Sequence, residues 1–391
     1  NAASIKFLEG LYDEYLPNFS SGTVNVGCDE TWELGKGRSK ARATKTSTTA
    51  VYLAFIKKVH KLCKKKGRRM QFWGDIILHQ PELIKALPQD ILALCWGYDD
   101  DHPYNKECRA FAEAGIEFHV CPGTSAWNSI TGRTDNCLAN LQNAARNGLK
   151  YGATGYLNTD WGDGGHHQVL PVSYLGFAAG AAYSWNLKSN RTVDLAGALS
   201  RHFFQDPTGK LGQFCLDLGR TLNRLPGLKR HNCSAINQLL FGKLKGGRLD
   251  ISGITKAQYR AAEAWLDSIS ADLADARPAC SDKDLVMQEL RHALAASHYA
   301  IHRGQFVQFG DGTAEALHHE LQGLVMVHEE QWLARNRRGG LRDAVALRVV
   351  RLDADVVRDA DGQARDGHVE RRAARHSGHD EGAHGRGRIN A

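Results

Sequence analysis

The chain has 391 residues, of which 42% are hydrophobic and 24% charged, and its formal net charge is +7 at pH 7, a balance typical of a globular protein with a core. The only dense basic run, at 64–69, has no interleaved aromatic residues, which favours a solvated loop over a nucleic-acid interface. No apolar stretch reaches the roughly 18–20 residues of a membrane span, and nine cysteines without a C-x-x-C pair indicate free thiols in a reducing, cytoplasmic compartment rather than disulfides or a zinc site.

One structural unit recurs along the first 185 residues: an amphipathic helical stretch, a short β-rich apolar run and a polar loop that contains glycine. After a helix within residues 1–20, we predict strands at 23–27, 69–77, 91–97, 116–121 and 154–159, with helices at 46–66, 81–87, 104–114 and 136–148. Nearly continuous apolar strands that alternate with helices predict a parallel sheet covered by helices.

Polar and aromatic residues gather at the C-terminal end of each predicted strand. They are Asp29 and Glu30, Trp73 and Asp75, Trp96 and Tyr98, Trp127, and Trp161 and Asp163. In a (β/α)8 TIM barrel these ends face one pocket that holds the active site. No G-x-G-x-x-G turn supports a doubly wound sheet. We therefore predict an α/β fold, a TIM barrel truncated to about its last five βα units, with the first three units upstream of this chain.

The predicted character of the chain changes twice more. Residues 1–188 form the barrel part, and residues 189–341 form a helical C-terminal region with helical spacing at 192–205, 209–224, 255–275, 282–303 and 312–335. Residues 342–391 contain no Lys and no aromatic residue. Such a segment buries too little apolar surface to order itself, so we expect a disordered tail.

The adjacent carboxylates Asp29 and Glu30 lie at a strand end among tryptophans, a combination that suits a sugar substrate. Indole rings stack on the C–H faces of sugars, while carboxylates bind hydroxyls and donate a proton to a glycosidic oxygen. Neighbouring residues on one strand point to opposite sides, so this pair is badly placed to act as nucleophile and acid across one bond. A substrate that supplies its own nucleophile fits the pair better.

Five blocks of sequence resemble glycoside hydrolase family 20, the β-N-acetylhexosaminidases. They are N-V-G-C-D-E-T-W-E-L-G-K-G (25–37), F-W-G-D (72–75), C-W-G-Y-D (95–99), C-P-G-T-S-A-W (121–127) and T-D-W-G-D (159–163). The L-G-K-G run is most similar to the hexosaminidase D-like branch. The blocks follow the order of the fourth to eighth strands of that family's barrel.

The resemblance implies substrate-assisted hydrolysis of terminal GlcNAc or GalNAc, without metal or cofactor. Glu30 would be the general acid and base, and Asp29 would orient the acetamido group of the sugar. The resemblance further implies that Trp73, Trp96 and Trp161 enclose the acetyl methyl group and the sugar ring, and that Asp163 holds sugar hydroxyls.

Two features depart from the family pattern. The family's acetamido-binding tyrosine is missing from C-P-G-T-S-A-W, so Tyr98 is the substitute candidate, beside Trp127 as a further substrate-binding candidate. The family's sugar-binding arginine belongs to the first strand, which this chain lacks. We therefore expect the isolated chain to be inactive, and poorly soluble because an open sheet leaves unpaired edges.

Other interpretations of these residues stay open at this stage. Asp29 could cap a helix, and the tryptophans could be ordinary barrel core. A retaining β-glycosidase could use Asp75 or Asp163 as its nucleophile, and a non-catalytic fragment could simply bind carbohydrate. His166 and His167 are adjacent and diverge, which argues against a metal pair, and the glycines at 162, 164 and 165 indicate a flexible loop.

Overall fold

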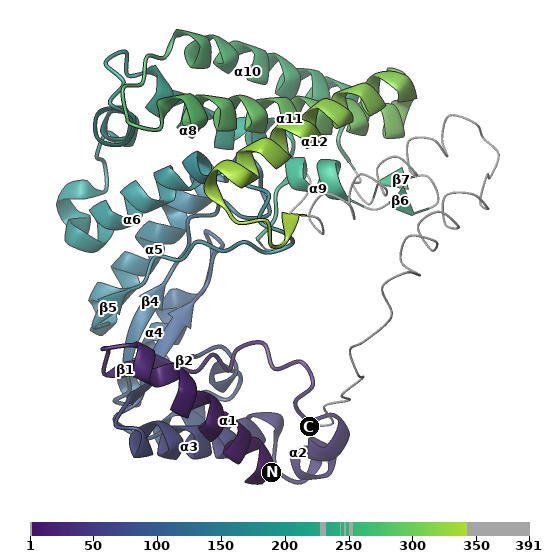
Figure 1. Cartoon of the computed structure of the whole chain (residues 1–391). Helices are drawn as coiled ribbons and strands as arrows, with labels where there is room; N and C mark the ends of the chain where they lie inside the picture. Colours follow the sequence, from purple (N-terminus) through teal and green to yellow (C-terminus); the bar gives the residue numbers. More distant parts are fainter. Residues whose placement is uncertain (1, 227–231, 243, 246–247, 250–252, 342–391) are drawn as a thin grey trace. The chain divides into compact units, whose positions relative to one another are not determined.

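The computed structural model describes residues 2–226, 232–242, 244–245, 248–249 and 253–341 (Figure 1). The chain divides into two compact units. The first comprises residues 1–122 and 140–159, and the second comprises residues 123–139 and the described residues from 160 onward. The predicted boundary at residue 188 stays a prediction, and the predicted disordered tail at 342–391 lies outside the described residues.

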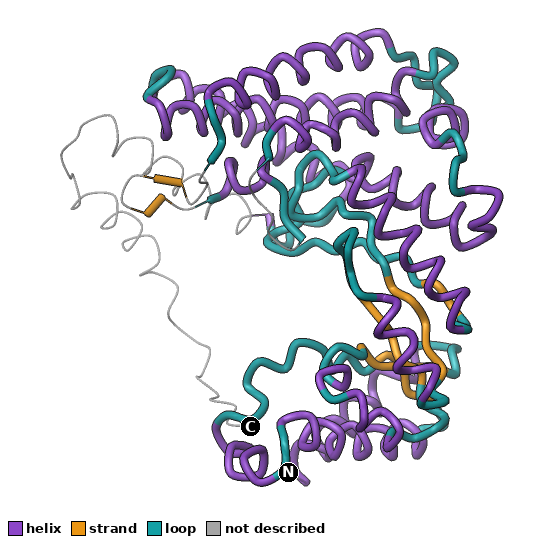
Figure 2. Tube along the Cα trace, turned by 180° about the vertical axis from the view of Figure 1, so that it is seen from behind, coloured by secondary structure: helices purple, strands orange, loops and turns teal. Residues whose placement is uncertain are grey.

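The first unit is built on a parallel sheet of five strands among its described residues (Figure 2, orange). The strands are β1 (Thr23–Asn25), β2 (Arg69–Trp73), β3 (Leu92–Trp96), β4 (Glu117–Cys121) and β5 (Gly155–Tyr156), paired in the order β1-β2-β3-β4-β5. A doubly wound sheet reverses its strand order part-way, whereas a barrel keeps neighbours in chain order. The predicted α/β class is confirmed and the order fits part of an α/β barrel; the number of missing units stays a prediction.

Helices connect successive strands of this sheet. They are α3 (Thr48–Lys65) between β1 and β2, the 3₁₀ helices η3 (Ile77–His79) and η4 (Pro81–Ala86) between β2 and β3, α4 (Tyr104–Glu113), and α5 (Thr134–Tyr151). The chain before β1 forms α1 (Ala2–Tyr15) and η1 (Leu16–Asn18), and the loop after β1 forms η2 (Gly37–Ser39) and α2 (Lys40–Lys45). The helix predicted at 81–87 is therefore a 3₁₀ helix, which Pro81 starts.

The core of the first unit lies between α3 and the sheet. Tyr52, Ile56, Val59 and Cys63 recur at helical spacing and are buried on one face of α3. They belong to the same apolar cluster as Phe72 of β2. Burial of each large side chain contributes roughly 1.5–3 kcal/mol, so this face fixes where the N-terminal turn of α3 meets the strand ends.

The second unit is helical in the part that the structure describes, apart from a short antiparallel hairpin. Its helices are α6 (Leu170–Asn190), α7 (Leu195–Ala198), the π-helical turn η5 (Leu199–Phe204), α8 (Lys210–Gly219), η6 (Arg220–Arg224), α9 (Ala235–Phe241), α10 (Lys256–Asp275), α11 (Lys283–Phe309) and α12 (Ala314–Arg335). The hairpin pairs β6 (Leu244–Lys245) with β7 (Arg248–Leu249). Helix α11 packs against α9, α10 and α12, so it lies at the centre of this unit.

Candidate active site

A strained turn follows β1 and carries the two candidate catalytic carboxylates. Gly27, Cys28 and Glu30 have φ angles of 70°, 73° and 47°. Such left-handed angles cost a non-glycine residue about 1–3 kcal/mol and gather at functional sites. The Gly27 N–H donates to Asn25 Oδ1 at 2.8 Å, which closes the start of the turn. Asp29 and Glu30 are both exposed on it.

No helix begins at this turn in the described chain. The next helical residues after Glu30 start at Gly37, in η2. The alternative interpretation of Asp29 as a helix N-cap is therefore wrong. The turn presents two neighbouring carboxylates to solvent instead of satisfying helix N–H groups.

Two buried groups hold this turn in place from behind. The Tyr52 hydroxyl, on a side chain only 2% exposed, donates to the Cys28 carbonyl at 2.9 Å and lies 3.4 Å from the Trp73 carbonyl. The Glu30 N–H donates to Asp75 Oδ2 at 3.0 Å. These contacts tie the end of β1 to α3 and to the end of β2, so the direction of the Glu30 side chain is set by the core.

Asp75 is a carboxylate held in an unusual environment. Burial raises its pKa, while the Glu30 N–H and the Trp96 indole favour its charged form and partly offset that rise. Asp75 Oδ1 and Trp96 Nε1 are both buried, and neither makes a hydrogen bond of ordinary geometry among the described residues. One carboxylate oxygen of Asp75 thus anchors the turn, while the Trp96 indole lies close enough to favour the charged form of the carboxylate.

The predicted aromatic residues of this unit follow the next two strands. Trp73 ends β2 and Trp96 ends β3, and both are partly buried. The Tyr98 ring stacks on Trp96 with centroids 5.2 Å apart and an angle of 27°, and Tyr98 is 8% exposed. Trp96, one member of this aromatic pair, is the one that lies next to the Asp75 carboxylate.

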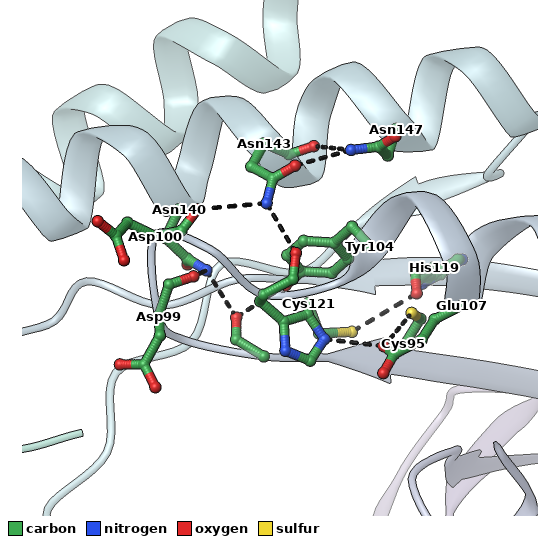
Figure 3. Close-up of polar contacts among 12 residues, drawn as sticks. Cys95, Asp99, Asp100, Tyr104, Glu107, His119, Cys121, Asn140, Asn143 and Asn147 are labelled. Atoms are coloured by element: carbon green, nitrogen blue, oxygen red, sulfur yellow. Dashed lines mark hydrogen bonds and ion pairs between the residues drawn. The ribbon is translucent and has the colours of Figure 1, made fainter. Parts of the chain in front are cut away.

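Side chains of α5 and α4 fix the loop that carries Tyr98 (Figure 3). Asn140 Nδ2 donates to the carbonyls of Gly97 and Asp99 at 2.9 and 3.0 Å, and the Tyr104 hydroxyl donates to the Gly97 carbonyl at 2.8 Å. Three hydrogen bonds from two side chains to two carbonyls leave this loop little freedom, so Tyr98 is presented by a rigid segment.

The other predicted site residues belong to the second unit. Trp127 is 1% exposed, whereas Trp161 and Asp163 are exposed on the loop after β5. Although Asp163 is exposed, partial desolvation by neighbouring groups raises the pKa of its carboxyl. The Gln168 amide donates to the Trp161 carbonyl at 2.6 Å and so anchors that loop.

The described residues offer few groups for a metal. In the described ranges, no set of three or more His, Cys, Asp or Glu side chains could hold a metal ion. His166 and His167 diverge, with His166 edge-on to Trp332 and His167 against Phe241. Within those same ranges no helix is long and apolar enough to cross a membrane.

Residues 1–141 match the family model described as glycosyl hydrolase family 20, catalytic domain. None of the curated proteins compared with the chain matches it. This match supports a relationship to that family and, with it, a glycoside hydrolase activity on hexosaminides. It contains the Asp29–Glu30 turn, Asp75 and the aromatic residues up to Trp127, whereas Trp161 and Asp163 lie beyond it.

Two residues that support the candidate carboxylates and the Tyr98 loop were not predicted from the sequence, Tyr52 and Asn140. Tyr52 was counted only within a helix, because it follows the apolar spacing of α3 and nothing local marks its hydroxyl as functional. Asn140 was missed for the same reason, since it lies inside a helical pattern. A polar atom on the buried face of each helix is the only signal that could have singled them out.

Proposed function

We propose that this chain is part of a β-N-acetylhexosaminidase of the hexosaminidase D-like branch, which removes terminal non-reducing GlcNAc or GalNAc residues. The observation that carries this proposal is the strained turn at 27–30. It exposes two adjacent carboxylates while Tyr52 and Asp75 hold its backbone. The match of residues 1–141 to the family 20 catalytic domain supports the same reaction class.

In the proposed first step, the acetamido oxygen of the sugar attacks C1 and the bond from C1 to the leaving oxygen breaks. Glu30 transfers its proton to that oxygen, and the sugar becomes a cyclic oxazolinium ion. Asp29 accepts the acetamido N–H, which orients the group and stabilises the positive charge that develops.

In the proposed second step, water attacks C1 and Glu30 takes its proton. The bond from C1 to the acetamido oxygen breaks, which restores the acetamide and the acid form of Glu30. Two inversions at C1 give net retention. The exposed position of both carboxylates lets substrate and water reach them without a change in the fold.

We assign the aromatic residues to the sugar. Trp73, Trp96 and Trp161 would enclose the acetyl group and the ring, and Tyr98 would donate to the acetamido carbonyl. Asp163 would bind ring hydroxyls. Trp127, at 1% exposure, is the weakest substrate contact of the set.

Hydrolysis of matched 4-nitrophenyl glycosides tests the mechanism in a longer product of the gene that carries a complete barrel. We expect turnover of the β-GlcNAc substrate and none of the β-glucoside, because only the former carries the acetamide. Glu30→Gln and Asp29→Asn should each lower kcat by about a hundredfold or more. Glu33→Gln, an exposed carboxylate three residues further on, is the matched control and should change little.

A thiazoline analogue of the cyclic intermediate gives an independent measurement. It should inhibit competitively and bind Asp29→Asn much more weakly than the unchanged chain. Equal turnover of glucoside and N-acetylglucosaminide, together with indifference to the thiazoline, would instead indicate a protein nucleophile such as Asp75.

A further inference from the structure

A cavity of about 420 Å³ lies in the second unit, apart from the residues assigned to the reaction. The loop after β5 and helices α11 and α12 line it with residues that include His166, Gln168, Glu289, Gln331, Trp332 and Arg335. Small-molecule sites have volumes of roughly 300–1,000 Å³, so this cavity is large enough for a ligand.

Gln331 of α12 is the residue that points to a polar occupant. It is 5% exposed, yet its amide Nε2 and Oε1 are both buried without a hydrogen-bond partner among the residues described. A buried amide with neither atom bonded is costly, and the cost is relieved only when a ligand or water supplies both an acceptor and a donor. A hydroxyl group or a second amide can do both.

An ion pair in the wall sets the charge that the cavity accepts. The Arg335 guanidinium donates to both oxygens of Glu289, at 2.6 and 2.8 Å, and to Asp282 at 2.9 Å. Two carboxylates more than neutralise Arg335 and leave the group with a net charge of −1, so an anion is disfavoured there. Both Glu289 oxygens are already occupied, so an ammonium group gains little. The wall therefore favours a neutral ligand.

The aromatic side of the cavity is also fixed in position. The Trp332 indole N–H donates to the Arg337 carbonyl at 2.8 Å, and the His166 ring lies edge-on with centroids 6.2 Å apart. The His328 ring also lies 6.1 Å from this indole, and an indole in a cavity wall can stack on the C–H surface of a ring. A ring with C–H faces, hydroxyl groups and no charge is a sugar.

We propose that this cavity is a binding site for a neutral saccharide. The argument uses only the groups that line the cavity, so it stands whether or not the proposed hydrolase reaction is correct. Gln168 joins the cavity to the loop of Trp161 through its bond to the Trp161 carbonyl, at 2.6 Å. A bound sugar would therefore stabilise that loop.

Isothermal titration calorimetry on the full chain, with Glu30→Gln present to prevent turnover, tests the site. The probes are N-acetylglucosamine, the charged analogues glucosamine and N-acetylglucosamine 6-phosphate, and glucose as a second neutral sugar. We expect the neutral sugars to bind, and both charged analogues to bind about tenfold more weakly or worse. Gln331→Met should weaken neutral sugar binding by about tenfold or more, because it removes both hydrogen bonds at nearly constant volume.

The matched control is Gln322→Met, an exposed position on the same helix, which should leave binding unchanged. Gln331→Met should also raise the melting temperature of the free chain, since it removes an unpaired buried amide. If it fails to fold, Trp332→Leu replaces it and should weaken sugar binding as strongly. The proposal is overturned if no neutral sugar binds, if binding survives these variants, or if only Asp29→Ala abolishes it.

Discussion

At the scale of single residues, Asp75 carries the clearest prediction. Burial raises the pKa of its carboxyl, so the folded chain holds that proton to a higher pH than the unfolded chain does. The ionisation of Asp75 therefore lowers the free energy of unfolding as the pH rises above about 4, the usual pKa of an aspartate. Asp75→Asn keeps an oxygen for the Glu30 N–H and removes the buried charge. We expect it to raise stability at pH 7, measured by urea unfolding.

Asp90→Asn is the opposite control in the same unit. Despite slight burial, a hydrogen bond from His60 holds the pKa of Asp90 below its usual value, so its charged form stabilises the fold at neutral pH. The Asp90 variant should therefore lose stability at pH 7. A loss of stability at pH 7 in both variants would show that Asp75 does not bear the cost of a buried charge.

Tyr52→Phe tests whether the core directs the catalytic turn. The change removes the donor to the Cys28 carbonyl and leaves the ring in place. We expect a loss of about 1 kcal/mol in unfolding free energy, together with a fall in kcat larger than any change in KM, because the Glu30 side chain is less well positioned. Tyr12→Phe, in the same apolar cluster, is the control and should leave kcat unchanged.

The candidate site was partly predictable from these residues. Asp29 and Glu30 are adjacent in the chain, so their pairing needs no knowledge of the fold. The contact between Glu30 and Asp75 depends on the parallel register of β1 and β2, and the sequence predicts that these strands end together without showing which atoms meet. The role of Tyr52 depends on one hydroxyl in an apolar face, which spacing alone does not distinguish from core.

At the scale of the elements, the close approach of α7 and α8 gives a stability prediction. A Cβ atom at Gly212 of α8 would lie 2.0 Å from the Ala196 carbonyl oxygen of α7, so the helices must separate to admit it. Gly212→Ala should lose about 1–3 kcal/mol in urea unfolding. Gly323→Ala on α12 meets nothing within 4 Å and should gain about 0.5–1 kcal/mol from helix propensity. Similar losses at both positions would contradict this packing.

Hydrophobic periodicity predicted the elements that have one buried face. Strands β1 to β5 and helices α3, α4, α5, α10, α11 and α12 were expected within a few residues of their bounds. Helix α6 was missed because its apolar residues are not confined to one face and Pro171 and glycines interrupt the pattern. The stretch 192–205 contains α7 and a π-helical turn that ends at Phe204 and is capped by Gln205, whose φ is 51°. Spacing does not predict that change of hydrogen bonding.

At the scale of the whole molecule, buried histidines set the response to acid. Burial lowers the pKa of His119 in the first unit and of His292 and His298 in the second. A histidine with a lowered folded pKa binds its proton more readily when unfolded, so stability falls as the pH drops below about 6.5. His302 acts in the opposite sense: despite burial, Glu320 and Glu263 raise its pKa. Three histidines have a lowered pKa and one has a raised pKa, so we predict that mild acid lowers the stability of the fold.

His292 dominates that response because burial and the charge of His328 lower its pKa to about 4. From the unfolded value of 6.5, the chain should lose about 2 kcal/mol from this group between pH 7 and pH 5. His292→Leu replaces the imidazole with an apolar side chain that cannot be protonated, so it should remove most of that loss in urea unfolding at the two pH values. His202→Leu, at an exposed position, should leave the difference unchanged. If both variants keep the full acid loss, protonation of other groups, rather than of the α11 histidine, limits the stability of this chain.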